Sequence, residues 1–87
     1  MKHAGPAALD RLEPLLETLR RNPGIKEKSR GTFYRGSRAF LHFHEHEGGF
    51  FADVRLQPAE DFERRPATTA AERKKLLGKI EKSLRAK

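Results

Sequence analysis

The stretch Phe40-Leu41-His42-Phe43-His44-Glu45-His46 has a histidine at every second position from residue 42, with Leu41 and Phe43 at the intervening positions of its first half, which is the period of a β-strand. It is followed by Gly48-Gly49 and by a second run, Phe50–Leu56, in which apolar and polar residues alternate from Ala52 onward. We interpret the two runs as an antiparallel hairpin with Gly48-Gly49 as its two-residue loop. In the register that this loop sets, His44 lies opposite Asp53, and the three histidines share a face with that carboxylate.

The hairpin register separates an aliphatic face from a mixed face. The aliphatic face, which we expect to be the core side, contains Leu41, Phe43, Ala52, Val54 and Leu56. The mixed face contains Phe40, His42, His44, His46, Phe51, Asp53 and Arg55. Because successive side chains of a strand point to opposite faces, a slip by one residue would scramble this arrangement.

Leucines at helical spacing indicate one helix on each side of the strands. Over residues 8–21 they form an apolar stripe, and Asp10 as the N-cap would place Pro14 in the first turn. Thr69-Ala70-Ala71-Glu72 has the pattern of a capping box at the start of the second helix. The buried stripe of that helix would contain Leu76, Leu77, Ile80 and Leu84. We expect residues 1–7 to be a flexible tail.

The remaining segments add strands to the hairpin. Thr32–Arg35 is a short strand candidate, and Gln57–Arg65 is a polar connection that could include an edge strand at Phe62. This order predicts a single α+β domain over residues 1–87, with a helix, a three- or four-stranded antiparallel meander and a second helix. Both helices would pack on one face of the sheet. The histidine face would then be wet or covered by a partner, for example in a homodimer.

Composition excludes several classes of site. The chain has 87 residues and no cysteine, which excludes disulfides, thiolate zinc sites and cysteine nucleophiles. No apolar stretch approaches the ~20 residues of a membrane span, and the N-terminus has no apolar signal-peptide region. We therefore expect a cytoplasmic protein without a membrane partner.

The net charge of +7 lies entirely in residues 64–87, which contain nine basic side chains and only two acidic ones, Glu72 and Glu81. Five cations occupy one arc of the second helix: Lys74, Lys75, Lys79, Lys82 and Arg85. Such an arc could bind nucleic acid or another polyanion through phosphates. The alternative is that it is only the solvated face of an amphipathic helix. No helix-turn-helix, RNA-recognition or zinc-finger pattern accompanies it.

The pair His42-x-His44 predicts a possible divalent-metal site. Alternate strand residues lie ~7 Å apart at Cα, and their imidazoles can converge on one ion at about 2.0–2.1 Å. Asp53 or His46 could complete the ligand set. Two alternatives remain: ordinary polar residues on a solvated sheet face, or a histidine cluster that senses pH or contacts a ligand.

Four elements of the chain occur in an order that is found in a known family: Asn22-Pro23-Gly24-Ile25, Phe33, Arg38-Ala39-Phe40-Leu41-His42-Phe43-His44 and Ala52-Asp53-Val54. In these elements the chain resembles a family of small uncharacterised bacterial proteins, the "luciferase-like" domains. Members share a Pro-Gly-Val/Ile element after a first helix, an Arg-x-x-x-His-x-His strand and an Ala-Asp hairpin return. The resemblance covers the middle third to half of the chain and implies no established activity.

No catalytic residue is assigned from the sequence. Asp53 with His44 resembles half of a catalytic triad, but Ser29, Ser37 and Ser83 lack the context of a nucleophile elbow. We therefore expect a non-catalytic binding or interaction module from a bacterium. Nucleic-acid binding through the basic helix is the first alternative, and a metal-dependent function at His42, His44 and Asp53 is the second.

Overall fold

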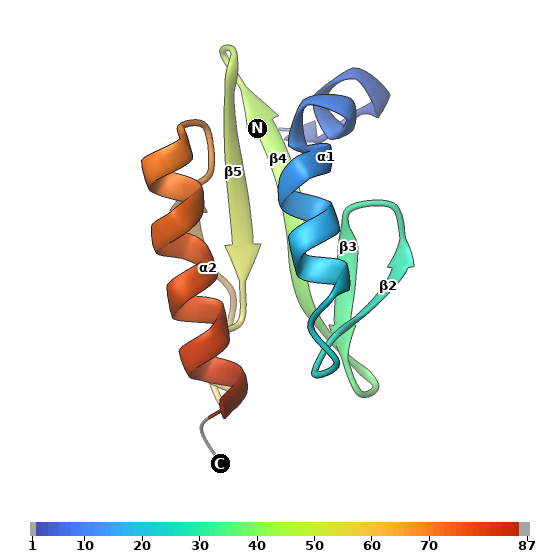
Figure 1. Ribbon diagram of the computed structural model, residues 1–87, viewed down its shortest axis with the longest axis vertical. Coiled ribbons are helices and arrows are strands. Elements are labelled where there is room, and N and C mark those ends of the chain that lie inside the picture. The colour runs from blue at the N-terminus through green and yellow to red at the C-terminus, as the bar shows by residue number, and fades with distance from the viewer. Residues whose placement is uncertain (1, 86–87) are drawn as a thin grey trace.

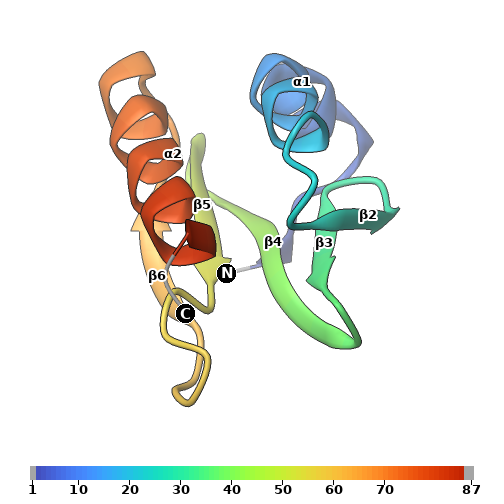
Figure 2. The ribbon, with the colours of Figure 1, turned by 60° about the horizontal axis from the view of Figure 1, so that its bottom comes forward.

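Two helices lie side by side on one face of a six-stranded antiparallel sheet (Figures 1 and 2). The computed structural model describes residues 2–85. The elements in chain order are β1 (Lys2–His3), α1 (Pro6–Arg20), β2 (Lys26–Ser29), β3 (Thr32–Arg35), β4 (Arg38–His46), β5 (Gly49–Val54), β6 (Glu63–Pro66) and α2 (Ala70–Arg85). The predicted α+β class is confirmed, with a larger sheet than the sequence indicated.

The sheet is built around β4, its longest strand. The strand order is β2-β3-β4-β5-β6, and β1 also pairs with β4. Because β5 occupies one edge of β4, β1 and β3 share the other edge, with β3 along its first half and β1 along its second. The strands β1 and β2 have only two and four residues with little apolar periodicity, which is why the sequence did not reveal them. The edge strand that the sequence allowed at Phe62 is β6, which begins one residue later, at Glu63.

The β4–β5 hairpin turns one residue earlier than predicted. Its loop is Glu47-Gly48, because His46 pairs with Gly49. Both loop residues have positive φ, 50° and 79°, as the type I′ hairpin turn requires. His42, rather than His44, is therefore directly opposite Asp53. The pairing has moved by two residues, so the predicted division into two faces is retained for every residue of the hairpin ladder, and only Phe40, before the ladder begins, changes sides.

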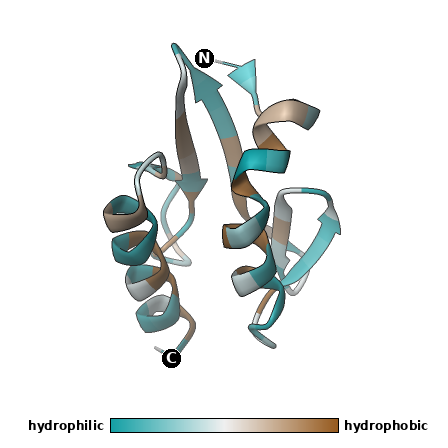
Figure 3. Ribbon diagram, turned by 45° about the horizontal axis from the view of Figure 1, so that its top comes forward, coloured by the Kyte–Doolittle hydropathy of each residue, from teal (hydrophilic) through white to brown (hydrophobic). Residues whose placement is uncertain are grey.

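The core lies between the sheet and both helices. The largest fully buried side chains are Leu12, Leu16, Leu19, Phe33, Phe40, Leu41, Val54, Leu76 and Ile80. Figure 3 shows apolar stretches on both helices and on the sheet between them. Phe40, which we expected on the histidine face, instead belongs to this core. A bulge between β3 and β4 explains the difference, because the pairing passes from Ala39 to Leu41 and takes Phe40 out of the alternation.

The first helix begins earlier than predicted. Gly5 is its N-cap and Pro6 fills the first turn, so Asp10 lies inside the helix and Pro14 is an interior proline. The segment expected as a tail therefore contains β1 at residues 2–3 and the start of α1 at residues 6–7, and the intervening Ala4 and Gly5 N–H groups donate to Phe43 and Glu45 of β4.

The second helix starts as predicted. Its capping box is confirmed, because the Glu72 carboxylate accepts from the Thr69 N–H at 3.1 Å and the Glu72 N–H donates to Thr69 Oγ1 at 3.1 Å.

Candidate metal centre

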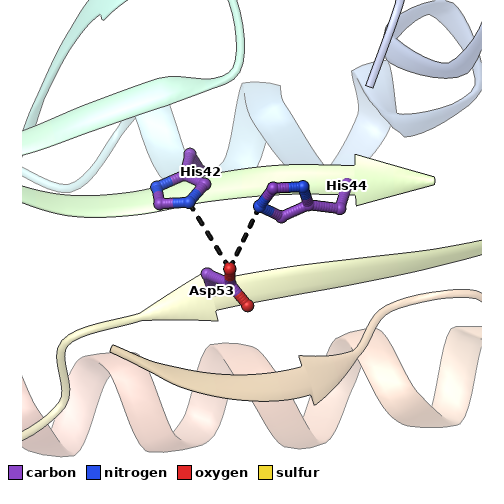
Figure 4. Close-up of side chains that lie close together, drawn as sticks. All are labelled: His42, His44 and Asp53. Atoms are coloured by element: carbon purple, nitrogen blue, oxygen red, sulfur yellow. Dashed lines mark ion pairs between the residues drawn. The ribbon is translucent and has the colours of Figure 1, made fainter. Parts of the chain in front are cut away.

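The face of the sheet opposite the helices carries the histidines of β4. His42 and His44 alternate along that strand, so both point away from the helices (Figure 4). Asp53 of β5 lies directly opposite His42, and Arg64 of β6 lies directly opposite Asp53. On the other edge of β4, His3 of β1 lies opposite His44. Pairing of four strands therefore gathers three imidazoles, one carboxylate and one guanidinium.

The two β4 histidines converge on a single oxygen atom. Oδ2 of Asp53 lies 3.0 Å from Nε2 of His44 and 3.5 Å from Nε2 of His42 (Figure 4). One candidate ligand atom from each residue lies within 4.8 Å of the other two. Two ligands at about 2.0–2.1 Å from a tetrahedral zinc ion stand about 3.3 Å apart. The two nitrogen–oxygen distances, 3.0 and 3.5 Å, bracket that separation.

His44 is the most constrained member of the site. It is 8% exposed, and it is the only buried polar or charged residue among residues 2–85. Neither of its ring nitrogens has a hydrogen-bond partner among residues 2–85. The 3.0 Å approach of Nε2 to Asp53 therefore lacks the alignment of a hydrogen bond. An ion beside the oxygen would explain the bent approach, because the nitrogen lone pair would point at the ion and not at the oxygen.

Asp53 is held and kept ionised by Arg64. The guanidinium donates two hydrogen bonds to the carboxylate, from Nε to Oδ1 at 2.8 Å and from Nη2 to Oδ2 at 2.9 Å. This bidentate contact lowers the pKa of Asp53 below its usual range. A ligating carboxylate in proteins commonly has such an outer partner that fixes its orientation. Oδ2 retains a second lone pair on the side of the histidines.

His42 is held in its neutral form. Burial lowers its pKa, and the neighbouring His44 adds to the effect, while Asp53 acts in the opposite direction. The ring of Phe62 packs edge-on against His42 at 4.9 Å between centroids. Arg55 in turn covers Phe62, with its guanidinium carbon 4.4 Å from the ring centroid. Since a metal binds the unprotonated imidazole, these contacts favour the ligating form.

The ligand set defines which ions fit. Two imidazoles and one carboxylate are found in zinc sites with one open position and in non-haem iron(II) sites. Calcium and magnesium prefer oxygen ligands throughout, which this cluster does not offer.

Two groups of predicted site residues lie away from the cluster. His46 follows on the same strand but is half-exposed, with Nε2 3.7 Å from Glu47 Oε1. The predicted cations belong to α2, which covers the face of the sheet opposite the histidines (Figure 1). Of these, Lys79 is partly buried and the other four are exposed: Lys74, Lys75, Lys82 and Arg85.

The sequence did not point to His3 or Arg64. A strand of two residues has no periodicity to detect, so residues 2–3 were assigned to a tail. Arg64 lies in a segment whose sequence shows no alternation of apolar and polar residues. Its hydrogen bonds to Asp53 depend on the pairing of β5 with β6. Only the sheet topology brings either residue to the site.

Comparison with known proteins gives no name to this arrangement. No protein-family model, no curated protein and no solved structure matches the chain. The resemblance to the luciferase-like family and a homodimer through the histidine face therefore stay predictions. Within residues 2–85, neither helix has the length and apolar content needed to cross a membrane.

Proposed function

We propose that this protein is a divalent-metal-binding module whose ion, zinc in the first instance, is bound by His42, His44 and Asp53. The observation that carries the proposal is the state of His44. Its two ring nitrogens are buried without hydrogen-bond partners, and one of them converges with His42 Nε2 on a single carboxylate oxygen. A bound ion would satisfy the nitrogen that is otherwise without a partner.

The competing explanation is an ordinary polar face of a sheet. Residues on such a face bond to water or to cross-strand partners. His44 does neither well, since it is 8% exposed and lacks an aligned acceptor. A buried polar group without a partner costs about 1–3 kcal/mol. An arrangement with this cost is easier to understand if a ligand offsets it, and the role fits a non-catalytic binding module.

Zinc titration by calorimetry tests the proposal directly. We expect the full chain to bind one Zn²⁺ per molecule, with binding abolished in His44→Ala and in Asp53→Asn. His46→Ala is the matched control, because this histidine lies on the same strand but outside the cluster. Circular dichroism of each variant establishes that it is folded. Absence of stoichiometric zinc or nickel uptake by the folded wild-type chain would refute the proposal.

A second candidate function is binding of nucleic acid, and the charges of α2 favour it. Within residues 2–85 the five basic side chains of its predicted arc form no ion pair, whereas Arg20, Arg30 and Arg64 all do. A hollow of about 590 Å³ between α1 and α2 is lined by Arg11, Arg73 and Lys74 and by no carboxylate. Lys74 is the member of the arc that lines this hollow, and cations without a carboxylate partner can neutralise phosphates.

Salt-dependent binding to duplex DNA and to single-stranded RNA tests this candidate. The variant changes Lys74, Lys75 and Lys79 to Gln, and the control changes the exposed Lys2, Lys26 and Lys28 to Gln, so both have the same reduced net charge. For DNA, the slope of log affinity against log salt should fall by about 0.9 for each phosphate that the variant no longer neutralises. Equal slopes for the variant and the control would contradict a specific role for α2.

A further inference from the structure

The N-terminal strand lies directly against the candidate metal centre. Lys2 pairs with Glu45 and His3 pairs with His44. Two further contacts continue the attachment: the Ala4 N–H donates to the Phe43 carbonyl at 3.0 Å, and the Gly5 N–H donates to Glu45 Oε2 at 2.8 Å. Residues directly opposite each other in an antiparallel pair point to the same face. The side chain of His3 is therefore on the face that carries the cluster.

The imidazole of His3 is already in contact with both β4 histidines. Its ring centroid is 4.6 Å from that of His44, with the planes 29° apart, and 5.7 Å from that of His42. Its nitrogens are not in the group of ligand atoms formed by His42, His44 and Asp53. Because His3 is exposed, a rotation of its side chain would change only its contacts with the two histidine rings. Such a rotation requires no displacement of the paired backbone.

We infer that His3 supplies the fourth protein ligand of the bound ion and that the ion fastens β1 to the sheet; this inference rests on the proposed metal binding. A tetrahedral ion held by His42, His44 and Asp53 has one position left. His3 is the titratable side chain that β1 places beside that position. Four protein ligands make a closed site of the structural kind, whereas a water in the fourth position would leave an open one.

The consequence is a metal-dependent attachment of the N-terminus. β1 has only two residues, and α1 starts at Pro6, three residues after His3. An ion bound by His3, by the two β4 histidines and by Asp53 would join β1 to β4 and β5. It would hold β1 on the edge of β4 that β1 shares with β3. It would also fix the point at which α1 leaves the sheet. Without the ion, this attachment depends on the pairing of a two-residue strand and on the hydrogen bonds of the Ala4 and Gly5 N–H groups.

Nitrogen-15 NMR of the imidazole rings during a Zn²⁺ titration of the full chain tests the inference. We expect one ring nitrogen of His3 to shift together with those of His42 and His44 at one equivalent of zinc. We also expect His3→Ala to lower the zinc affinity by about tenfold or more, since even the outer partners of a ligand change metal affinity by about 10–100-fold. Lys2→Ala is the control, because it changes the same strand on its other face.

The outcomes separate this inference from the proposal on which it rests. If the wild-type chain binds no zinc, the proposed function fails and His3 has no ion to bind. If zinc shifts His42 and His44 but leaves the His3 nitrogens unmoved, with His3→Ala binding as tightly as wild type, the fourth ligand is not His3. The metal site would then stand with an open position, and the inference would be overturned.

Discussion

Replacing His44 by leucine should make the metal-free protein more stable while it removes metal binding. Leucine has a similar volume and no polar atoms, and the site is 8% exposed. In the metal-free protein the two ring nitrogens of His44 are buried without hydrogen-bond partners. His44→Leu removes those atoms, so it removes a desolvation cost that nothing in the folded chain offsets.

The size of the change in unfolding free energy follows from two opposing effects of the substitution. A buried polar group without a partner costs about 1–3 kcal/mol, and the substitution removes this cost. The substitution also removes the 3.0 Å approach of His44 Nε2 to Asp53, a poorly aligned interaction worth about 1 kcal/mol or less. Asp53 keeps its two bonds from Arg64. With about 1 kcal/mol subtracted for the lost interaction, the net stabilisation should be about 0–2 kcal/mol, or up to roughly 16 °C in melting temperature for a domain of this size.

Thermal and urea unfolding, with and without zinc, provide the assay. In a chelator the His44→Leu variant should melt above wild type. At a zinc concentration of about 100 times Kd, the wild type should gain about 2.7 kcal/mol and the variant nothing, so their order reverses. His46→Leu, at a half-exposed position, should change stability by less than about 0.5 kcal/mol. A metal-free His44→Leu variant less stable than wild type would refute the reasoning, since it would mean that His44 is satisfied by Asp53.

Three other predictions concern protonation and backbone conformation. Because burial holds the pKa of His42 below its ordinary 6.5, the unfolded chain takes up a proton that the folded chain resists. Urea unfolding of the metal-free protein should therefore show stability falling as pH falls from about 7.5 to about 5.5, at no more than about 1.4 kcal/mol per pH unit for this group. The His42→Gln variant should flatten that dependence, and an unchanged slope would contradict the assignment. Gly78→Ala should raise the unfolding free energy by about 1 kcal/mol, because the site is exposed inside α2 and a Cβ there meets nothing within 4 Å; a lower midpoint in urea would count against it. Gly31→Ala should instead cost about 1–2 kcal/mol by the same measurement, because its φ is +82° and the new Cβ would lie 2.6 Å from Leu9 Cδ2; an unchanged midpoint would show that the turn adapts.

The helices were the easier part of the fold to predict. The capping box at Thr69 and Glu72 placed the start of α2 correctly, because it is a local pattern whose bonds form within four residues. The start of α1 was misplaced, because both Pro6 and Pro14 can occupy a first turn and nothing local distinguishes them. The structure selects Pro6, since the preceding Gly5 N–H is held by Glu45, 40 residues away in the chain.

The candidate site was predicted in part. The alternation along β4 put His42 and His44 on one face, and the hairpin put Asp53 on the same face despite a pairing that was wrong by two residues. This tolerance has a simple reason: a shift by two residues preserves the faces, whereas a shift by one exchanges them. His46 shares their strand, but it lies beyond the reach of Asp53.

The sequence by itself determined the α+β class, the alternation that aligns two histidines, and the cap of the second helix. These properties depend on side chains close together in the chain, and their periods can be read from it. Only the tertiary structure decided that His3 and Arg64 lie beside the candidate site and that Phe40 lies in the core and not on the histidine face. Each of these placements depends on pairing between strands far apart in sequence or on a bulge. It also decided that His44 is buried without a partner, since burial depends on all the elements that pack around a residue.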